Sequence, residues 1–204
     1  MNAVDVRELM AFHDGRHSIA GWARSGAAAH GAGFWLAVED NHRCNCLLWE
    51  EEDLARRRNV PDAEIAGNKR AIDRHNQQRN DAIERIDEQL LSVLSEIKTK
   101  PDAKLNSETP GAMIDRLSIL SLKVHHMRLQ TLRTDVDRAH VQACEAKLVR
   151  LDEQRQDLAG CLDRLLAEVA CGEARFKIYR QFKMYNDPAL NPALYGESKR
   201  STRS

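Results

Sequence analysis

Charged and amide side chains interrupt the apolar faces of the helical segments, at positions where the helical repeat would place leucine or isoleucine. In two consecutive segments, residues 34–58 and 62–98, the polar residues at these inward positions are Asn41, Asn45, Glu52, Lys69, Asn76 and Arg79. An ion buried without a partner strongly destabilises a folded protein. We therefore expect these side chains to bond to one another or to a ligand, which makes the protein interior the candidate site.

A third segment, residues 110–133, adds inward groups of the same kind, and the expected cations outnumber the clear inward carboxylates. Because guanidinium and ammonium groups bind the oxygens of carboxylates and phosphates, this excess favours a small anionic ligand. The expected ligand-binding residues are Asn41, Asn45, Lys69, Asn76, Arg79, Arg116, Lys123 and His126. Glu52 is the candidate general base, because neighbouring cations would set its pKa.

An antiparallel hairpin of the first two long segments would bring residues equidistant from the loop to the same level. The resulting pairs are Glu52 with Lys69, Asn45 with Asn76, and Asn41 with Arg79. Such pairs could also satisfy one another without any ligand and serve only to fix the helix register. In that alternative the chain is a non-catalytic module that binds another protein through its outer helix faces.

Metal-ligating residue types are present, but their spacing does not predict a metal centre. Cys44 and Cys46 have neither a second cysteine pair nor a nearby histidine at zinc-ligand spacing. Three histidines follow an acid by three residues, as in half of a di-iron site, and the pairs are Asp14/His17, Glu39/His42 and Asp137/His140. A site of that kind also needs a glutamate on each of two partner helices. The sequence predicts no metal and no cofactor.

Composition narrows the class of protein. Charged residues make up 30% of the 204 residues and aromatic residues 5%, which favours long helices over sheets. Basic and acidic residues balance at 31 each, so no overall field would attract nucleic acid or an anionic membrane. The odd number of cysteines, 5, indicates free thiols, and neither a signal peptide nor a membrane-spanning run is evident. We expect a cytoplasmic protein.

The periodicity predicts an all-α protein, an up-down helical bundle of four long helices after a short N-terminal helical segment. The long helices are expected over residues 34–58, 62–98 and 110–133, and from 135 to beyond 179, with Asp62 and Thr109 as N-caps. Residues 99–110 should form a loop. We expect one domain over residues 1–185 and a C-terminal extension over 186–204 whose last residues are disordered. Homodimerisation through the fourth long helix is compatible with either function.

Four separated motifs follow one another along the chain: NHRCNCLLWEEEDLARR, AIDRHNQQRNDAIERID, LNSETPGAMIDRLSILSLKVHHM and FKMYNDPALNPALYG. Together they resemble a bacterial family known as domain of unknown function 4254, over most of the chain from Asn41 to Tyr195. Cys44 and Cys46 depart from a more apolar or aromatic pattern there. The resemblance implies a bacterial, helical, intracellular protein and an association with cell-envelope sugar pathways. That association would suit a sugar phosphate or a nucleotide sugar as ligand.

Overall fold

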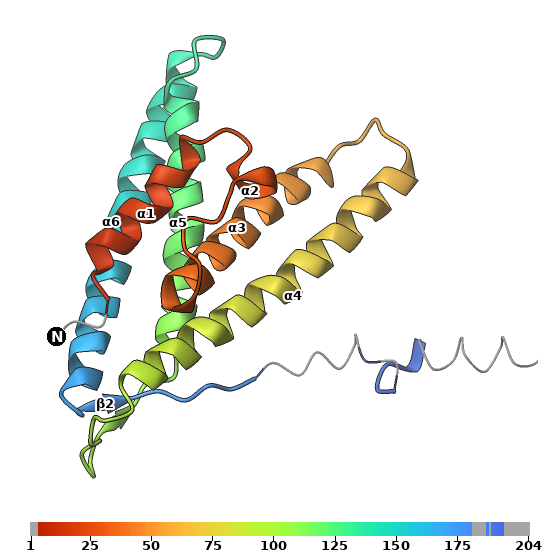
Figure 1. Cartoon of the computed structure of the whole chain (residues 1–204). Helices are drawn as coiled ribbons and strands as arrows, with labels where there is room; N and C mark the ends of the chain where they lie inside the picture. Colours follow the sequence, from red (N-terminus) through yellow and green to blue (C-terminus); the bar gives the residue numbers. More distant parts are fainter. Residues whose placement is uncertain (1–3, 181–186, 188, 194–204) are drawn as a thin grey trace, which may run out of the picture.

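The computed structural model describes residues 4–180, 187 and 189–193, and it is all-α, as the sequence predicts (Figure 1). Its helices are α1 (Val6–His17), α2 (Trp22–Ser25), α3 (Gly33–Leu54), α4 (Asp62–Val93), α5 (Pro110–Thr131) and α6 (Arg138–Ala170). Two short strands, β1 (Lys104–Leu105) and β2 (Ala174–Arg175), pair in parallel. The predicted bundle of four long helices after a short N-terminal helical segment is confirmed.

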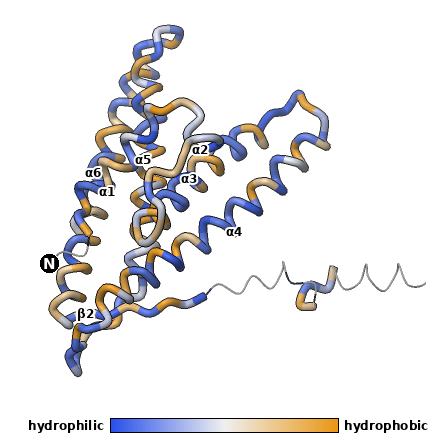
Figure 2. Tube along the Cα trace, viewed as in Figure 1, coloured by the Kyte–Doolittle hydropathy of each residue, from blue (hydrophilic) through white to orange (hydrophobic). Residues whose placement is uncertain are grey.

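The four long helices form two antiparallel hairpins, α3–α4 and α5–α6. Figure 1 shows that the hairpins come together where α4 leads into α5 and diverge toward their two loops. Helix α1 packs along α5 and α6, and α2 packs on α3. The hydropathy of each long helix alternates along its length, as expected for helices that bury one face (Figure 2).

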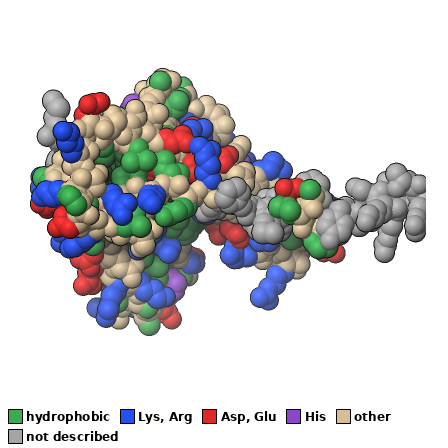
Figure 3. Space-filling model, turned by 90° about the horizontal axis from the view of Figure 1, so that it is seen from below, with side chains coloured by type: hydrophobic (Ala, Val, Ile, Leu, Met, Phe, Trp, Pro, Cys, Tyr) green, Lys and Arg blue, Asp and Glu red, His purple; other side chains and the backbone are tan. Residues whose placement is uncertain are grey.

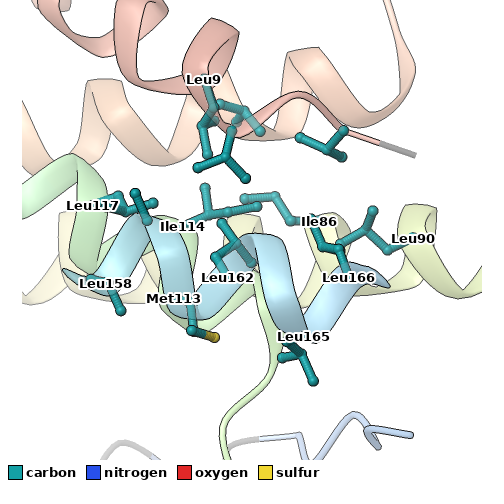
Figure 4. Packing of buried hydrophobic residues seen from close by; sticks show 14 of the residues in the cluster. Leu9, Ile86, Leu90, Met113, Ile114, Leu117, Leu158, Leu162, Leu165 and Leu166 are labelled. Atoms are coloured by element: carbon teal, nitrogen blue, oxygen red, sulfur yellow. The ribbon is translucent and has the colours of Figure 1, made fainter. Parts of the chain in front are cut away.

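The hydrophobic core lies where the hairpins come together. In Figure 4, Leu9 of α1 lies over Ile114 of α5, and Leu162 of α6 and Ile86 of α4 complete the contact. All four side chains are fully buried. Each fully buried aliphatic side chain contributes about 1.5–3 kcal/mol to folding. This core holds α1 against both hairpins, and α1 and α3 contribute the histidines discussed below.

Local sequence signals set some of the helix ends. Thr109 caps α5, because its Oγ1 accepts a hydrogen bond from the Ala112 N–H at 3.2 Å. The predicted N-cap at Asp62 is wrong by one residue: Pro61 is the cap and Asp62 begins the helix. Hydrogen-bonding side chains thus mark only some of the helix starts.

The expected continuation of the last helix beyond residue 179 is wrong, since α6 ends at Ala170. Gly172 follows with φ of 71°, a left-handed conformation that stops a helix. Strand β2 then pairs with β1. Strand β1 lies within residues 99–110, the segment that was expected to be only a loop.

The described residues do not reach far enough to test the predicted C-terminal extension. Residues 181–186, 188 and 194–204 lie outside them, and so do the boundary near residue 185 and the expected disorder of the last residues. Among the described helices, none combines the length and the apolar composition needed to cross a bilayer. On the face shown in Figure 3, basic and acidic side chains are interspersed rather than separated, in keeping with the balanced overall charge.

Candidate functional site

A buried polar network joins α3, α4 and α5. The Oδ1 atom of Asp115 accepts hydrogen bonds from the Nδ2 atoms of Asn41 at 2.8 Å and Asn45 at 2.9 Å. The Nε of Arg79 lies 4.0 Å from the same oxygen. Asn41 and Asn45 are 0% and 3% exposed, so these bonds are shielded from water. The anion held by the interior amides and by Arg79 is therefore a carboxylate of the chain itself.

This arrangement confirms one part of the predicted geometry. Asn41 and Arg79 lie at the same level, as expected, because both reach Asp115. Asn76 is half-buried and takes no part in these bonds. Because Asp115 is the counter-ion of Arg79, the described part of this network offers no excess of cations to an outside anion.

Four of the predicted groups lie at the surface. Glu52 and Lys69 form the predicted pair, with 3.5 Å between carboxylate and ammonium, but their side chains are 36% and 56% exposed. Arg116 and Lys123 are exposed, and Arg116 binds the carboxylate of Glu108 at 2.8 Å. The expectation that these four side chains point inward is wrong.

The cause on α5 is a one-residue error in assigning the inward face. Successive residues of an α-helix are rotated by about 100°, so only one of Asp115 and Arg116 can face α3. Asp115 does, and Arg116 and Lys123 instead line a groove between α5 and α6 together with Gln154. The same rotation places Ser118 in the interior, fully buried.

Ser118 extends the polar network to a group of histidines. Its Oγ accepts a hydrogen bond from Asn45 Nδ2 at 3.0 Å and lies 2.8 Å from Nδ1 of His42. A continuous path of hydrogen bonds therefore connects Asp115 to the imidazole of His42, and every member of that path is buried.

Two pairs of residues with a spacing of four face each other across α1 and α3. They are His13/His17 on α1 and His42/Cys46 on α3. One ring nitrogen of His17, one of His42 and the Cys46 Sγ all lie within 4.8 Å of one another. The His13 ring centroid is 4.7 Å from that of His42. Residues four apart share one helix face, which explains why His17, His42 and Cys46 converge, while the His13 ring packs on that of His42 with its nitrogens outside the group.

The hydroxyl of Ser121, one turn beyond Ser118, fixes the tautomer of His17. Ser121 Oγ donates its only proton to the Ser118 carbonyl oxygen at 2.7 Å. It must therefore accept the hydrogen bond from His17 Nε2, which lies 3.1 Å away. The lone pair of neutral His17 is then on Nδ1.

His13 is the least satisfied polar side chain of this group. It is 0% exposed, and within the described part of the chain neither of its ring nitrogens has a hydrogen-bond partner. An unpaired buried donor or acceptor costs about 1–3 kcal/mol, so such a residue needs an explanation.

Burial keeps these groups uncharged near neutral pH. Burial, and then the charge of Arg155, lower the pKa of His13 to about 3. Burial, and then the neighbouring His125, lower that of His17 to about 4. Burial raises the pKa of the Cys46 thiol to about 12. Neutral imidazoles and a protonated thiol therefore line the site.

A cavity of about 280 Å³ opens beside this cluster. Its lining includes Arg16, His17, Trp22, Cys46, Trp49, Glu50, Asp53, His125 and His126. The Arg16 guanidinium lies over the rings of Phe12 at 4.6 Å and Trp22 at 5.5 Å. Its Nε is buried and has no hydrogen-bond partner among the described residues. His126 stacks on Trp49, with ring centroids 4.4 Å apart.

Sequence reasoning missed most of this second site. His126 was expected to bind ligand and does line the cavity. The other histidines and Cys46 could have been found from the spacing of four residues in His13/His17 and His42/Cys46. The statement that Cys46 has no suitably spaced histidine is wrong, because His42 Nε2 lies 3.8 Å from its Sγ.

Two of the acids in the acid–histidine pairs, Glu39 and Asp14, bind other partners. Glu39 accepts hydrogen bonds from the Ala29 N–H and binds Arg43 and His30, not a group shared with His42. Asp14 binds Arg155 at 2.9 Å. These carboxylates therefore serve to anchor neighbouring segments.

Comparison with known proteins gives one match. Residues 35–178 match the model of a family described as Protein of unknown function (DUF4254). The chain belongs to this family. No curated protein and no solved structure matches it. The matched span of this DUF4254 chain contains the Asp115 network, His42 and Cys46, while α1, with His13 and His17, precedes it.

Proposed function

We propose that this DUF4254 protein binds a small anionic ligand in the cavity beside the histidine cluster. The observation that carries the proposal is the Arg16 guanidinium: it lines the cavity, and its buried Nε lacks a hydrogen-bond partner among the described residues. Phe12 and Trp22 hold the guanidinium plane in place. A positioned guanidinium binds carboxylate or phosphate oxygens through two parallel hydrogen bonds.

The other lining groups suit an anion that also carries hydroxyl groups. Imidazole N–H groups of His125 and His126 can add donors to the anion. Of the two lining acids, Glu50 is neutralised by Arg24 at 2.8 Å, which leaves Asp53 to accept hydrogen bonds from ligand hydroxyls. A phosphorylated sugar offers both kinds of group.

The size of the cavity narrows the ligand class further. Its volume of about 280 Å³ lies just below the range for small-molecule sites, about 300–1,000 Å³. This favours a sugar phosphate over the larger nucleotide sugar. Glu52 has no role as general base in this proposal, because its side chain is engaged in surface ion pairs with Arg56 and Lys69.

Calorimetric titration of the purified protein with phosphorylated sugars, nucleotide sugars and inorganic phosphate tests the proposal. We expect saturable binding of a phosphorylated sugar, and about a 10–100-fold loss of affinity in Arg16→Met, since a hydrogen bond to a charged group contributes about 1.5–3 kcal/mol. Arg116→Met, in the groove between α5 and α6, is the matched control and should bind as the parent does.

Two results would overturn this function. Equal binding by the Arg16→Met variant and the parent would remove the cavity as the anion site. A flat response to every ligand would instead favour the alternative, a non-catalytic module that binds another protein through its outer helix faces.

A further inference from the structure

We propose that the facing pairs His13/His17 and His42/Cys46 form a binding site for a transition-metal ion, with Zn²⁺ as the best match. The site adjoins the cavity, whose lining includes His17 and Cys46. It goes beyond the proposed function, because metal binding here needs no anion.

The distances already approach those of a tetrahedral site. Bonds of about 2.0–2.1 Å to nitrogen and about 2.3 Å to sulfur place neighbouring donors of a tetrahedron about 3.5 Å apart. His42 Nε2 and Cys46 Sγ are 3.8 Å apart, and the ring nitrogen of His17 lies within 4.8 Å of both. Contraction by about 1 Å, within reach of side-chain rotation, would bring these three donors to the distances of a tetrahedral site.

Two serines of α5 orient the histidines as the outer partners of a metal site do. A metal-bound histidine donates its second ring N–H to an oxygen, which fixes the ring and the tautomer. Ser121 accepts from His17 Nε2 and so leaves the Nδ1 lone pair for a metal. Ser118 stands 2.8 Å from His42 Nδ1, on the side away from Cys46, and leaves Nε2 to coordinate.

His13 supplies the observation that points most directly to an occupant. Its imidazole is 0% exposed and unpartnered at both nitrogens among the described residues, yet it lies against His42. A metal ion between the two helices gives one of those nitrogens a bond. The nitrogens of His13 lie outside the group formed by His17, His42 and Cys46, so its ring must turn toward that group to become the fourth ligand. The site then has three nitrogen donors and one sulfur.

This donor set selects the class of metal. Thiolate and imidazole ligands in tetrahedral geometry favour Zn²⁺, whereas Mg²⁺ and Ca²⁺ prefer oxygen ligands. On binding, the Cys46 Sγ forms the bond to the metal and its thiol proton is released to solvent. No oxidation state changes.

Titration of the metal-free protein with Co²⁺, which reports on thiolate ligation by absorption, tests the inference. We expect one Co²⁺ per chain, a thiolate-to-cobalt charge-transfer band in the near ultraviolet, the intense visible bands of tetrahedral Co²⁺, and displacement by Zn²⁺. Cys46→Ala should abolish the charge-transfer band. His42→Ala and His17→Ala should weaken affinity at least about 100-fold, more than the 10–100-fold typical of outer-sphere partners.

The chain contains a matched control for the cysteine. His140 and Cys144 of α6 have the same spacing, with Sγ and Nε2 at 3.5 Å, but no third ligand stands beside them among the described residues. Cys144→Ala should leave the cobalt spectrum unchanged. A charge-transfer band that survives Cys46→Ala, or no band in the parent protein, would overturn the site.

The role of His13 has its own test. His13→Leu removes two unsatisfied nitrogens, so it should raise the melting temperature of the metal-free protein while lowering Co²⁺ affinity at least about 100-fold, as the loss of a ligand does. Unchanged Co²⁺ affinity would overturn its assignment as a ligand. Arg16→Met should leave the cobalt spectrum intact, so anion binding and metal binding can fail separately.

Discussion

At the scale of single residues, the carboxylate of Asp115 organises the polar network by accepting hydrogen bonds from two side-chain amides. Asp115→Ala would leave one N–H of Asn41 and one of Asn45 without an acceptor and Arg79 without its counter-ion, although Asn45 would keep its bond to Ser118. Because each unsatisfied buried group costs about 1–3 kcal/mol, we expect a loss of about 3 kcal/mol in the free energy of unfolding, measured by urea denaturation.

The matched control for Asp115 is Asp40, whose carboxylate binds Arg85 at 2.7 Å but is 37% exposed. Asp40→Ala should lose at most about 1 kcal/mol, because exposed ion pairs contribute little. Equal losses in the two variants would contradict a stabilising role for the interior network.

A second buried carboxylate makes stability depend on pH in a defined direction. Asp87 is 2% exposed, and burial raises its pKa from 3.8 to about 6, although hydrogen bonds from Thr109 and Gly111 act in the opposite direction. Folded Asp87 thus holds its proton more tightly than the unfolded chain does. Its contribution to the free energy of unfolding is complete below pH 3.8, falls as pH rises to about 6, and is then lost.

Asp87→Asn keeps a carbonyl acceptor for the Gly111 N–H and removes the ionisation. We expect the variant to be more stable than the parent at pH 8 by about 1–3 kcal/mol, with the difference shrinking toward pH 4. Urea denaturation across this range measures it. Asp81→Asn, at an exposed position of the same helix, should show no such trend.

At the scale of elements, the end of α6 depends on one glycine. Gly172 has φ of +71°, and a Cβ there would stand 2.5 Å from the Lys98 carbonyl oxygen. Gly172→Ala should therefore destabilise the protein by about 2 kcal/mol or more, through left-handed strain and the clash. Gly160, inside α6, has nothing within 4 Å, so Gly160→Ala should stabilise by about 0.5–1 kcal/mol. Urea denaturation that showed the same sign for both would contradict this account.

Helix content and most helix starts followed from the sequence because repeat and cap residues are local signals. Thr109 and Pro110 marked the start of α5 for this reason. The choice between Asp115 and Arg116 was not local, since it depends on which side of α5 meets α3. The proximity of His17 and Cys46 also could not be read from local signals, because Leu9 and the core beneath α1 determine where that helix packs.

At the scale of the whole molecule, two hairpins that join at one end and diverge at the other should differ in local stability. The joined end contains fully buried Ile86 and Ile114. Residues 62–70 and 131–143, near the free ends of the hairpins, include no buried residue. Amides around the two isoleucines should exchange hydrogen only through global unfolding, whereas those of the free ends should exchange through local opening.

Native-state hydrogen exchange at two protein concentrations tests this gradient and also whether two copies pair through the fourth long helix. Leu132 and Val149 of the α5–α6 hairpin are 69% and 68% exposed, so a second copy pairing there would cover them. A monomer should show the gradient at both concentrations. Protection of residues 131–143 that grows with concentration, together with a doubled mass in solution, would instead establish pairing through this hairpin. Equal protection along both hairpins at the lower concentration would contradict the divergent architecture as the source of local stability.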